Sequence, residues 1–149
     1  MDKLNELISR YDLPSLGDFE KDFGRVEKVD NYILSEFRKK IAEKIDYFIS
    51  ILESLVQPDN NLSGIYESRY LSDEQRQELF GIFRILMSYS RKSSSLSTSY
   101  DEEKEAEFIK DFYNEWQSIK PIMENYLFLL SDMWKKEINS DDIKENYMG

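Results

Sequence analysis

Four acidic residues in the first third of the chain have the spacing of a carboxylate metal site. Glu27 and Asp30 form one Glu-x-x-Asp pair, and Glu43 and Asp46 form a second pair 16 residues later. Two acids three residues apart share one face of a helix, and carboxylate oxygens are the ligands that Mg²⁺ prefers. These pairs suggest one alternative function, a carboxylate-only, magnesium-dependent all-α nucleotide hydrolase.

The composition weakens this metal-site hypothesis. The 149 residues include 30 Asp and Glu, so such pairs arise by chance, and solvated helix faces are the simpler explanation. Asp30 stands apart because it falls in the phase of an apolar stripe. A buried Asp is more often paired with a cation, such as Arg84, than with a metal. We therefore expect no metal ion and no cofactor.

The chain contains no histidine and no cysteine. The first absence removes the commonest general base and metal ligand, and the second removes thiolate chemistry, zinc–thiolate sites and disulfides. Gly-rich phosphate loops and dinucleotide fingerprints are also missing from the sequence. A nucleophilic Ser, Thr or Tyr would depend on a Lys or a carboxylate as its base. We therefore expect a protein without catalytic activity.

The candidate contacts for an anion are four basic residues: Arg38, Lys39, Lys40 and Lys44. Glu36 and Glu43 lie among them, which favours a salt-bridged helix surface. The cluster could also meet the acidic segment 101–107, within the molecule or across a dimer. The net charge of −10 argues against general nucleic-acid binding, because the field repels phosphate. Association with nucleic acid, or mimicry of it by the acidic face, is kept as a further alternative.

Apolar periodicity predicts the helices that position these residues. The clearest pattern has apolar residues at alternating steps of three and four, which keeps them on one face of a helix. Its members are Ile109, Phe112, Trp116, Ile119, Met123, Tyr126, Leu130 and Met133. A capping-box pattern that begins at Ser99 predicts the start of this helix. The stripe keeps its phase across Pro121, so we expect one kinked helix over 100–138.

A second long stripe extends from Phe19 to Leu55 and predicts a long helix over 18–56. Asp30 interrupts the stripe, so the alternative is two helices that meet near residues 29–31. We favour one continuous helix. Pro58 ends it, and residues 57–71 are expected to form an irregular connection.

Shorter patterns complete the chain. Apolar spacing predicts a short helix over 2–12, and a capping box at Ser72 and Gln75 begins a helix over 73–91. Residues 139–149 are expected to form a frayed C-terminal tail. The sequence therefore predicts one domain over 1–149 with an all-α fold, an antiparallel helical bundle of three long helices plus a short N-terminal helix. Because no signal peptide or membrane-spanning stretch is recognisable, we expect a soluble, cytoplasmic protein.

Two segments, 79–89 and 122–134, contain more apolar residues than one helix–helix seam requires. The surplus residues are Phe80, Ile85, Tyr89, Leu127, Phe128, Leu129 and Trp134. Unless the two segments pack on each other, these residues form an apolar patch larger than monomers normally expose. We therefore predict a protein–protein interaction module, an adaptor or assembly subunit that binds a protein partner or a second copy of itself. The sequence indicates no small-molecule ligand and no specific family motif.

Overall fold

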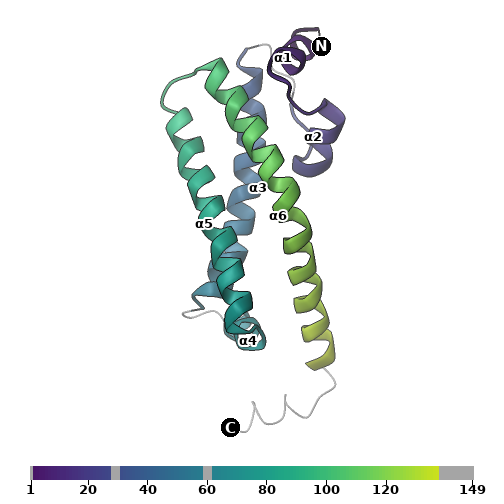
Figure 1. Cartoon of the computed structure of the whole chain (residues 1–149), viewed down its shortest axis with the longest axis vertical. Coiled ribbons are helices and arrows are strands. Elements are labelled where there is room, and N and C mark those ends of the chain that lie inside the picture. The colour runs from purple at the N-terminus through teal and green to yellow at the C-terminus, as the bar shows by residue number, and fades with distance from the viewer. Residues whose placement is uncertain (1, 28–30, 59–61, 138–149) are drawn as a thin grey trace.

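The computed structural model describes residues 2–27, 31–58 and 62–137, which form six helices and no strand (Figure 1). The helices are α1 (Asp2–Tyr11), α2 (Leu16–Phe23), α3 (Ile33–Val56), α4 (Leu62–Tyr70), α5 (Asp73–Leu96) and α6 (Glu102–Glu137). The all-α prediction is confirmed, although the described residues form two more helices than predicted. None of the described helices is both long and apolar enough to cross a membrane.

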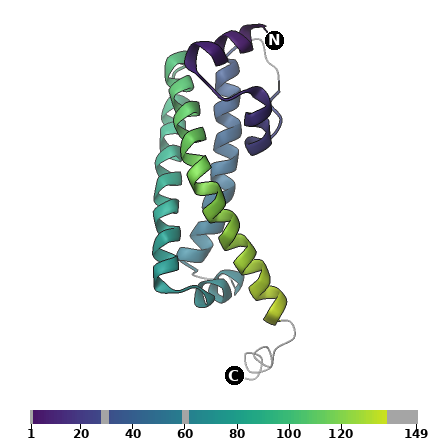
Figure 2. The same ribbon diagram turned by 45° about the vertical axis from the view of Figure 1, so that its right-hand side comes forward.

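Three long helices, α3, α5 and α6, lie side by side, and α5 runs antiparallel to the other two (Figures 1 and 2). The helix α3 packs against both α5 and α6 more extensively than these two pack against each other. The eight apolar residues of the 109–133 stripe are between 0 and 9% exposed, so this predicted face is buried along its whole length. The core therefore lies along α3 and α6.

The region 18–56 is two helices, so the prediction of one continuous helix was wrong. The helix α2 ends because Gly24 has a φ of +91°, a conformation that favours glycine, and its N–H donates to the Glu20 carbonyl at 2.9 Å. The helix α3 begins only after Tyr32, which is left-handed with a φ of +58°. Asp30 lies outside the described residues. The apolar phase continues across the break, which is why phase alone did not reveal it.

The connection 57–71 contains the helix α4 and is therefore more regular than predicted. Gly64 is buried against the end of α3, where an added Cβ would lie 2.6 Å from both the carbonyl O and Oγ of Ser54. Tyr66 packs against Trp134 with 5.7 Å between ring centroids, and the Trp134 indole N–H donates to Glu67 at 3.0 Å. The helix α4 thus connects the end of α3 to the end of α6.

The helix α5 begins at the predicted capping box. The Gln75 N–H donates to Ser72 Oγ at 3.1 Å, and the Ser72 N–H donates to Gln75 Oε1 at 2.8 Å. The helix continues through the serine-rich segment to Leu96, beyond the predicted end at residue 91. These serines therefore belong to a helix rather than to a loop.

The helix α6 is one helix through Pro121, as predicted. Its N-terminal cap is Asp101 rather than Ser99, because Asp101 Oδ1 accepts from the Lys104 N–H at 3.2 Å. Proline removes one backbone hydrogen bond and its ring crowds the preceding turn. Figure 2 shows the second half of α6 leaning away from α5. The two helices are therefore closest near the start of α6.

The helix α1 docks on α6, whereas α2 packs against both α3 and α6. The Tyr11 hydroxyl donates to Glu102 Oε2 at 2.8 Å. The two carboxylate oxygens of Asp22 accept from Gln117 Nε2 and Lys120 Nζ, each at 2.8 Å. Both contacts join residues more than 90 positions apart in the sequence.

Two glycine substitutions test this packing. Gly64→Ala should lower the free energy of unfolding by about 1–3 kcal/mol, because the added methyl group collides with Ser54. Gly81→Ala is the matched control: nothing lies within 4 Å of an added Cβ there, and alanine should stabilise α5 by about 0.5–1 kcal/mol. Urea unfolding followed by circular dichroism measures both changes. Equal effects of the two substitutions would contradict the close contact between α4 and α3.

Candidate functional site

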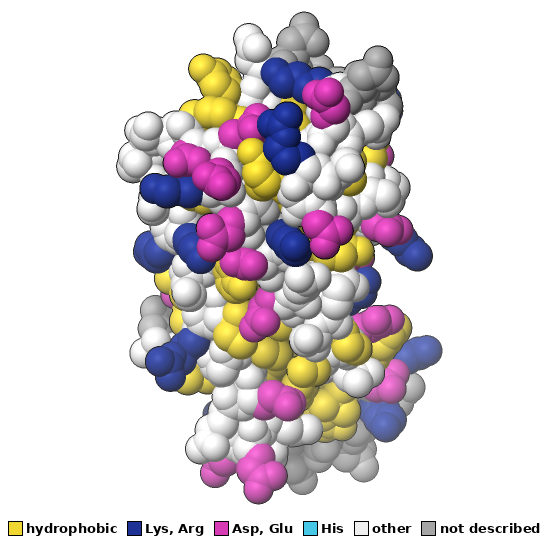
Figure 3. All heavy atoms as spheres, turned by 45° about the horizontal axis from the view of Figure 1, so that its top comes forward, with side chains coloured by type: hydrophobic (Ala, Val, Ile, Leu, Met, Phe, Trp, Pro, Cys, Tyr) yellow, Lys and Arg dark blue, Asp and Glu magenta, His cyan; other side chains and the backbone are white. Residues whose placement is uncertain are grey.

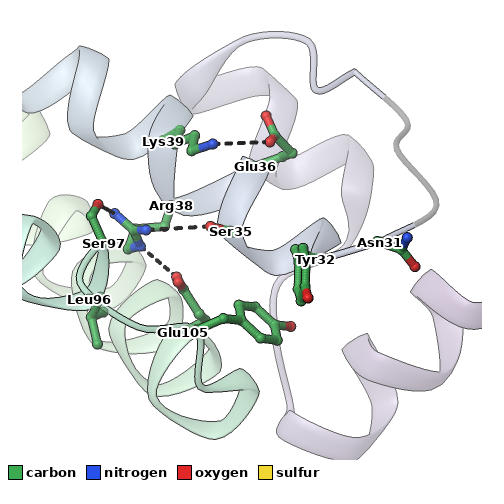
Figure 4. A pocket seen from close by; sticks show the side chains of 10 residues that line it. Asn31, Tyr32, Ser35, Glu36, Arg38, Lys39, Leu96, Ser97 and Glu105 are labelled. Atoms are coloured by element: carbon green, nitrogen blue, oxygen red, sulfur yellow. Dashed lines mark hydrogen bonds and ion pairs between the residues drawn. The ribbon is translucent and has the colours of Figure 1, made fainter.

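One buried ion pair joins the three long helices. Arg38 of α3 and Glu105 of α6 have side chains that are 3% and 1% exposed, and Arg38 Nε donates to Glu105 Oε2 at 2.6 Å. Arg38 Nη1 donates to the carbonyl O and Oγ of Ser93 at 2.9 and 2.8 Å and to Ser97 Oγ at 3.2 Å. Figure 4 shows the guanidinium between Ser35, Ser97 and Glu105. The N–H groups of the Arg38 guanidinium therefore donate to acceptors within the protein.

The predicted anion contact thus has a different arrangement from an open basic patch. Arg38 meets the acidic segment 101–107 within the molecule, which is one of the two arrangements that the sequence suggested. Lys39 and Lys40 each pair with a glutamate of the same helix, at 3.3 and 3.5 Å. Lys44 lies apart from them, with its amino group 5.7 Å from the ring centroid of Phe48.

The sequence contains a pattern that predicts the pairing of Arg38 with Glu105, although a search for apolar residues alone does not find it. The buried face of α3 contains Leu34, Arg38, Ile41, Ile45, Phe48, Leu52 and Leu55. Arg38 therefore occupies a seam position of that helix. Glu105 precedes Ile109 by four residues and extends the seam of α6 in phase. Two opposite charges on two buried seams predict a buried ion pair.

A pocket of about 430 Å³ lies where α3 begins, α5 ends and α6 begins (Figure 4). It is lined by Asn31, Tyr32, Ser35, Glu36, Arg38, Lys39, Leu96, Ser97, Tyr100 and Glu105. The rings of Tyr32 and Tyr100 lie 4.4 Å apart. Glu105 Oε1 is buried and has no hydrogen-bond partner in the part of the chain that the structure describes. The charge of Glu105 is already matched by Arg38. We therefore interpret this pocket as a gap in the packing where the three helices meet, and not as a binding site.

The acids of the alternative metal-site hypothesis do not converge in the described part of the chain. Glu27 follows α2, whereas Glu43 and Asp46 lie exposed on α3. Asp30 is outside the described residues. Within residues 2–27, 31–58 and 62–137, no group of three or more Asp and Glu is placed to hold a metal ion.

The residues of the predicted interaction surface lie on more than one side of the molecule. Phe80 and Phe128 are 48% and 65% exposed. Trp134 packs against Tyr66 of α4 and donates a hydrogen bond to Glu67. The remaining residues, Ile85, Tyr89, Leu127 and Leu129, are half-buried.

Three consecutive residues of α6 show why these side chains form no single patch. Leu127 lines a pocket beside α2 and α3, whereas Leu129 lines a groove beside α5. Phe128 lies between them and is the most exposed of the large apolar side chains on α6. Successive helical residues are about 100° apart, so α6 presents two separate apolar edges, one on each side of Phe128.

The groove between α5 and the second half of α6 has a volume of about 390 Å³. It is lined by Gln75, Glu78, Ile122, Asn125, Tyr126 and Leu129. The Tyr126 hydroxyl donates to Glu78 Oε1 at 2.6 Å across the two helices. Burial, and then this hydrogen bond, raise the pKa of Tyr126 to about 12.

Figure 3 shows hydrophobic side chains gathered over the lower half of the face that it displays, with acidic side chains among them.

The pocket on the other side of α6 is smaller, about 240 Å³, and lies between α2, α3 and α6. Four apolar residues line it, Phe48, Trp116, Met123 and Leu127, together with the charged residues Lys21, Asp22, Lys44, Lys120 and Glu124. The hydrogen bond from Lys120 to Asp22 raises the pKa of Lys120. This pocket brings Lys44 of the predicted anion contact together with Leu127 of the predicted interaction surface.

The buried ion pair predicts a large loss of stability when one partner is removed. Arg38→Met should lower the free energy of unfolding by about 3–5 kcal/mol, because Glu105 is left buried without its cation. Lys39→Met is the matched control on the same helix and should change it by no more than about 1 kcal/mol, since its ion pair is exposed. Urea unfolding at pH 7 measures both values.

The double variant Arg38→Met/Glu105→Met separates the loss of a partner from the loss of packing. It should recover most of the stability, because no unpaired charge remains buried. A double variant as unstable as Arg38→Met would contradict this account of the pair.

Tyr126 predicts a pH dependence at the alkaline end. Its pKa in the folded protein, about 12, lies above the ordinary value of 10.0. The neutral phenol therefore stabilises the fold fully below pH 10, and this contribution is lost as the pH rises to about 12. In urea unfolding from pH 8 to pH 11.5, Tyr126→Phe should lose less stability than the wild type. Tyr47, 61% exposed, provides the control, and Tyr47→Phe should follow the wild type.

Comparisons with models of protein families, with curated proteins and with solved structures gave no match to this chain. The function is therefore inferred from the geometry of these sites.

Proposed function

We propose that this protein is a helical interaction module, in which α3, α5 and α6 form an antiparallel three-helix scaffold that binds one helix of a protein partner. The observation that carries the proposal is the groove between α5 and α6. It is open because the second half of α6 leans away from α5 (Figure 2), and it is lined from both helices. A groove between two diverging helices is a common receptor for an amphipathic helix.

The lining of the groove defines the apolar part of the partner. Ile122 and Leu129, seven residues apart on α6, are half-buried and lie two turns apart on the same edge. Gln75 and Asn125 add amide groups that can hydrogen-bond at the margins. A helix with apolar residues at intervals of three and four would cover both Ile122 and Leu129.

The charges beside the groove define the polar part of the partner. Glu78 lies in the lining, and Asp111 and Glu115 lie on α6 before the groove residues, toward the start of the helix. Burial first, and then Glu115 and Asp111, raise the pKa of Tyr89 on α5, which supports a place for both acids on the side of α6 that faces α5. The partner helix that fits is therefore one with Lys or Arg on both sides of its apolar stripe. A second copy of this chain fits less well, because each copy has a net charge of −10.

A model peptide tests this function. The probe is a fluorescently labelled helical peptide of 18 residues in which pairs of Leu alternate with pairs of Lys. Its fluorescence anisotropy is measured at 150 mM salt as the protein is added. The double variant Ile122→Ser/Leu129→Ser should bind it about tenfold more weakly, because two apolar contacts are lost. Phe128→Ser is the matched control, since Phe128 is exposed on α6 outside the groove, and should change the affinity by less than about twofold.

Three outcomes would contradict the proposal. One is equal binding by the wild type and the groove variant. Another is a larger effect of Phe128→Ser than of the groove variant. The last is self-association in sedimentation velocity that the groove variant abolishes, since this would assign the groove to a second copy of the chain.

A further inference from the structure

The pocket between α2, α3 and α6 is a second site, on the edge of α6 opposite to the α5–α6 groove. Its apolar part is formed by buried side chains that pack on one another. Phe48 and Trp116 are 9% and 3% exposed, with 5.3 Å between their ring centroids, and Met123 is 2% exposed. These side chains provide an apolar floor for a flat or slender group.

Cations gather around this floor, although the protein as a whole is acidic. Three lysines, Lys21, Lys44 and Lys120, face two acids, Asp22 and Glu124, in the lining. Both oxygens of Asp22 are already engaged by Gln117 and Lys120. In the described part of the chain neither Lys21 nor Lys44 takes part in an ion pair. The pocket therefore has two cations without a carboxylate partner in the described ranges, and the amino group of Lys44 lies 5.7 Å from the ring centroid of Phe48.

A buried donor at the same pocket lacks an acceptor. The indole N–H of Trp116 is buried and has no hydrogen-bond partner among the described residues, and Trp116 lines the pocket. A buried N–H without an acceptor is uncommon in native proteins, because it has lost its water without replacement. A ligand oxygen that reached this N–H after a small movement of the lining would satisfy it.

We propose that this pocket binds a small carboxylic acid that has an aromatic or short aliphatic group. The carboxylate pairs with Lys21 and Lys44 and accepts from the Trp116 N–H after a small movement of the lining, and the apolar group packs on Phe48 and Met123. A lysine ammonium beside a carboxylate forms a charge-assisted hydrogen bond, and the rings below it exclude water.

The volume of the pocket limits the ligand to a small molecule. Its 240 Å³ exceeds the roughly 150 Å³ of an apolar cavity that holds benzene. It is below the range of about 300–1,000 Å³ that is typical of drug-sized ligands. One ring or a short chain with a single acid group fills this volume.

The experiment uses the two tryptophans of the chain as reporters. In a ¹⁵N spectrum of the 149-residue chain, each indole N–H gives one signal, and Trp134→Phe identifies the signal of Trp116. The probe is 3-phenylpropionate, titrated at pH 7. The Trp116 signal should shift saturably as its N–H gains an acceptor, while the Trp134 signal, already bonded to Glu67, should stay in place.

Matched variants and an uncharged ligand separate this site from general apolar binding. Lys44→Met keeps the aliphatic stem and should raise the Kd for phenylpropionate at least about fivefold. Lys39→Met, on the same helix and outside this pocket, should leave the Kd unchanged. 3-Phenylpropionamide should bind at least about fivefold more weakly than the acid, because it lacks the charge.

Two results would overturn the proposal. One is the absence of a saturable shift of the Trp116 signal in a wild type that is folded by circular dichroism. The other is equal binding of the acid and the amide together with no effect of Lys44→Met, which would show an apolar cavity without anion selectivity. Neither result bears on the α5–α6 groove, because the groove variants and the peptide probe involve none of these residues.

Discussion

The buried pair of Arg38 and Glu105 sets the relative positions of the three long helices. Removing two charges from water is unfavourable, and their attraction compensates only when further hydrogen bonds satisfy the remaining donors. Ser93 and Ser97 supply acceptors for the guanidinium from the end of α5. A shift of one helix along another would break several of these bonds at once. The pair therefore fixes the axial register of α3, α5 and α6, which apolar contacts alone define less sharply.

The two candidate sites exist because the two flanks of α6 contact different helices. Its seam is buried along its length, and its two flanks meet different neighbours: α5 on one side, α2 and α3 on the other. Beyond Pro121 the helix leans away from α5, so one flank becomes an open groove (Figure 2). On the other flank α2 ends at Phe23, and the space below it is the lysine-lined pocket. One helix thus separates an apolar groove with acidic surroundings from a pocket with cations.

Apolar phase predicted the helices whose seams are regular, and the 109–133 stripe is buried as expected. Phase could not locate the end of α2, because the pattern continues beyond Gly24 although the backbone there is left-handed. Arg38 occupies a seam position of α3, but a count of apolar residues passes over a charged one, and its partner Glu105 lies 67 residues away in the sequence. Composition revealed surplus apolar residues in 122–134. The sequence alone could not predict that Leu127 and Leu129 point to different sites, because this depends on which helices lie on either side of α6.

The docking of α1 and α2 on α6 affects the order in which the chain can acquire its structure during synthesis. Asp22 is made early, yet Gln117 and Lys120, its hydrogen-bond partners, follow about 95 and 98 residues later. At about 5–20 residues per second, roughly 5–20 s separate these residues on the ribosome. The first helix of the chain, which contacts α6, is therefore among the last to find its place, and Phe23 lacks its ring contacts with Phe112 and Trp116 until α6 emerges.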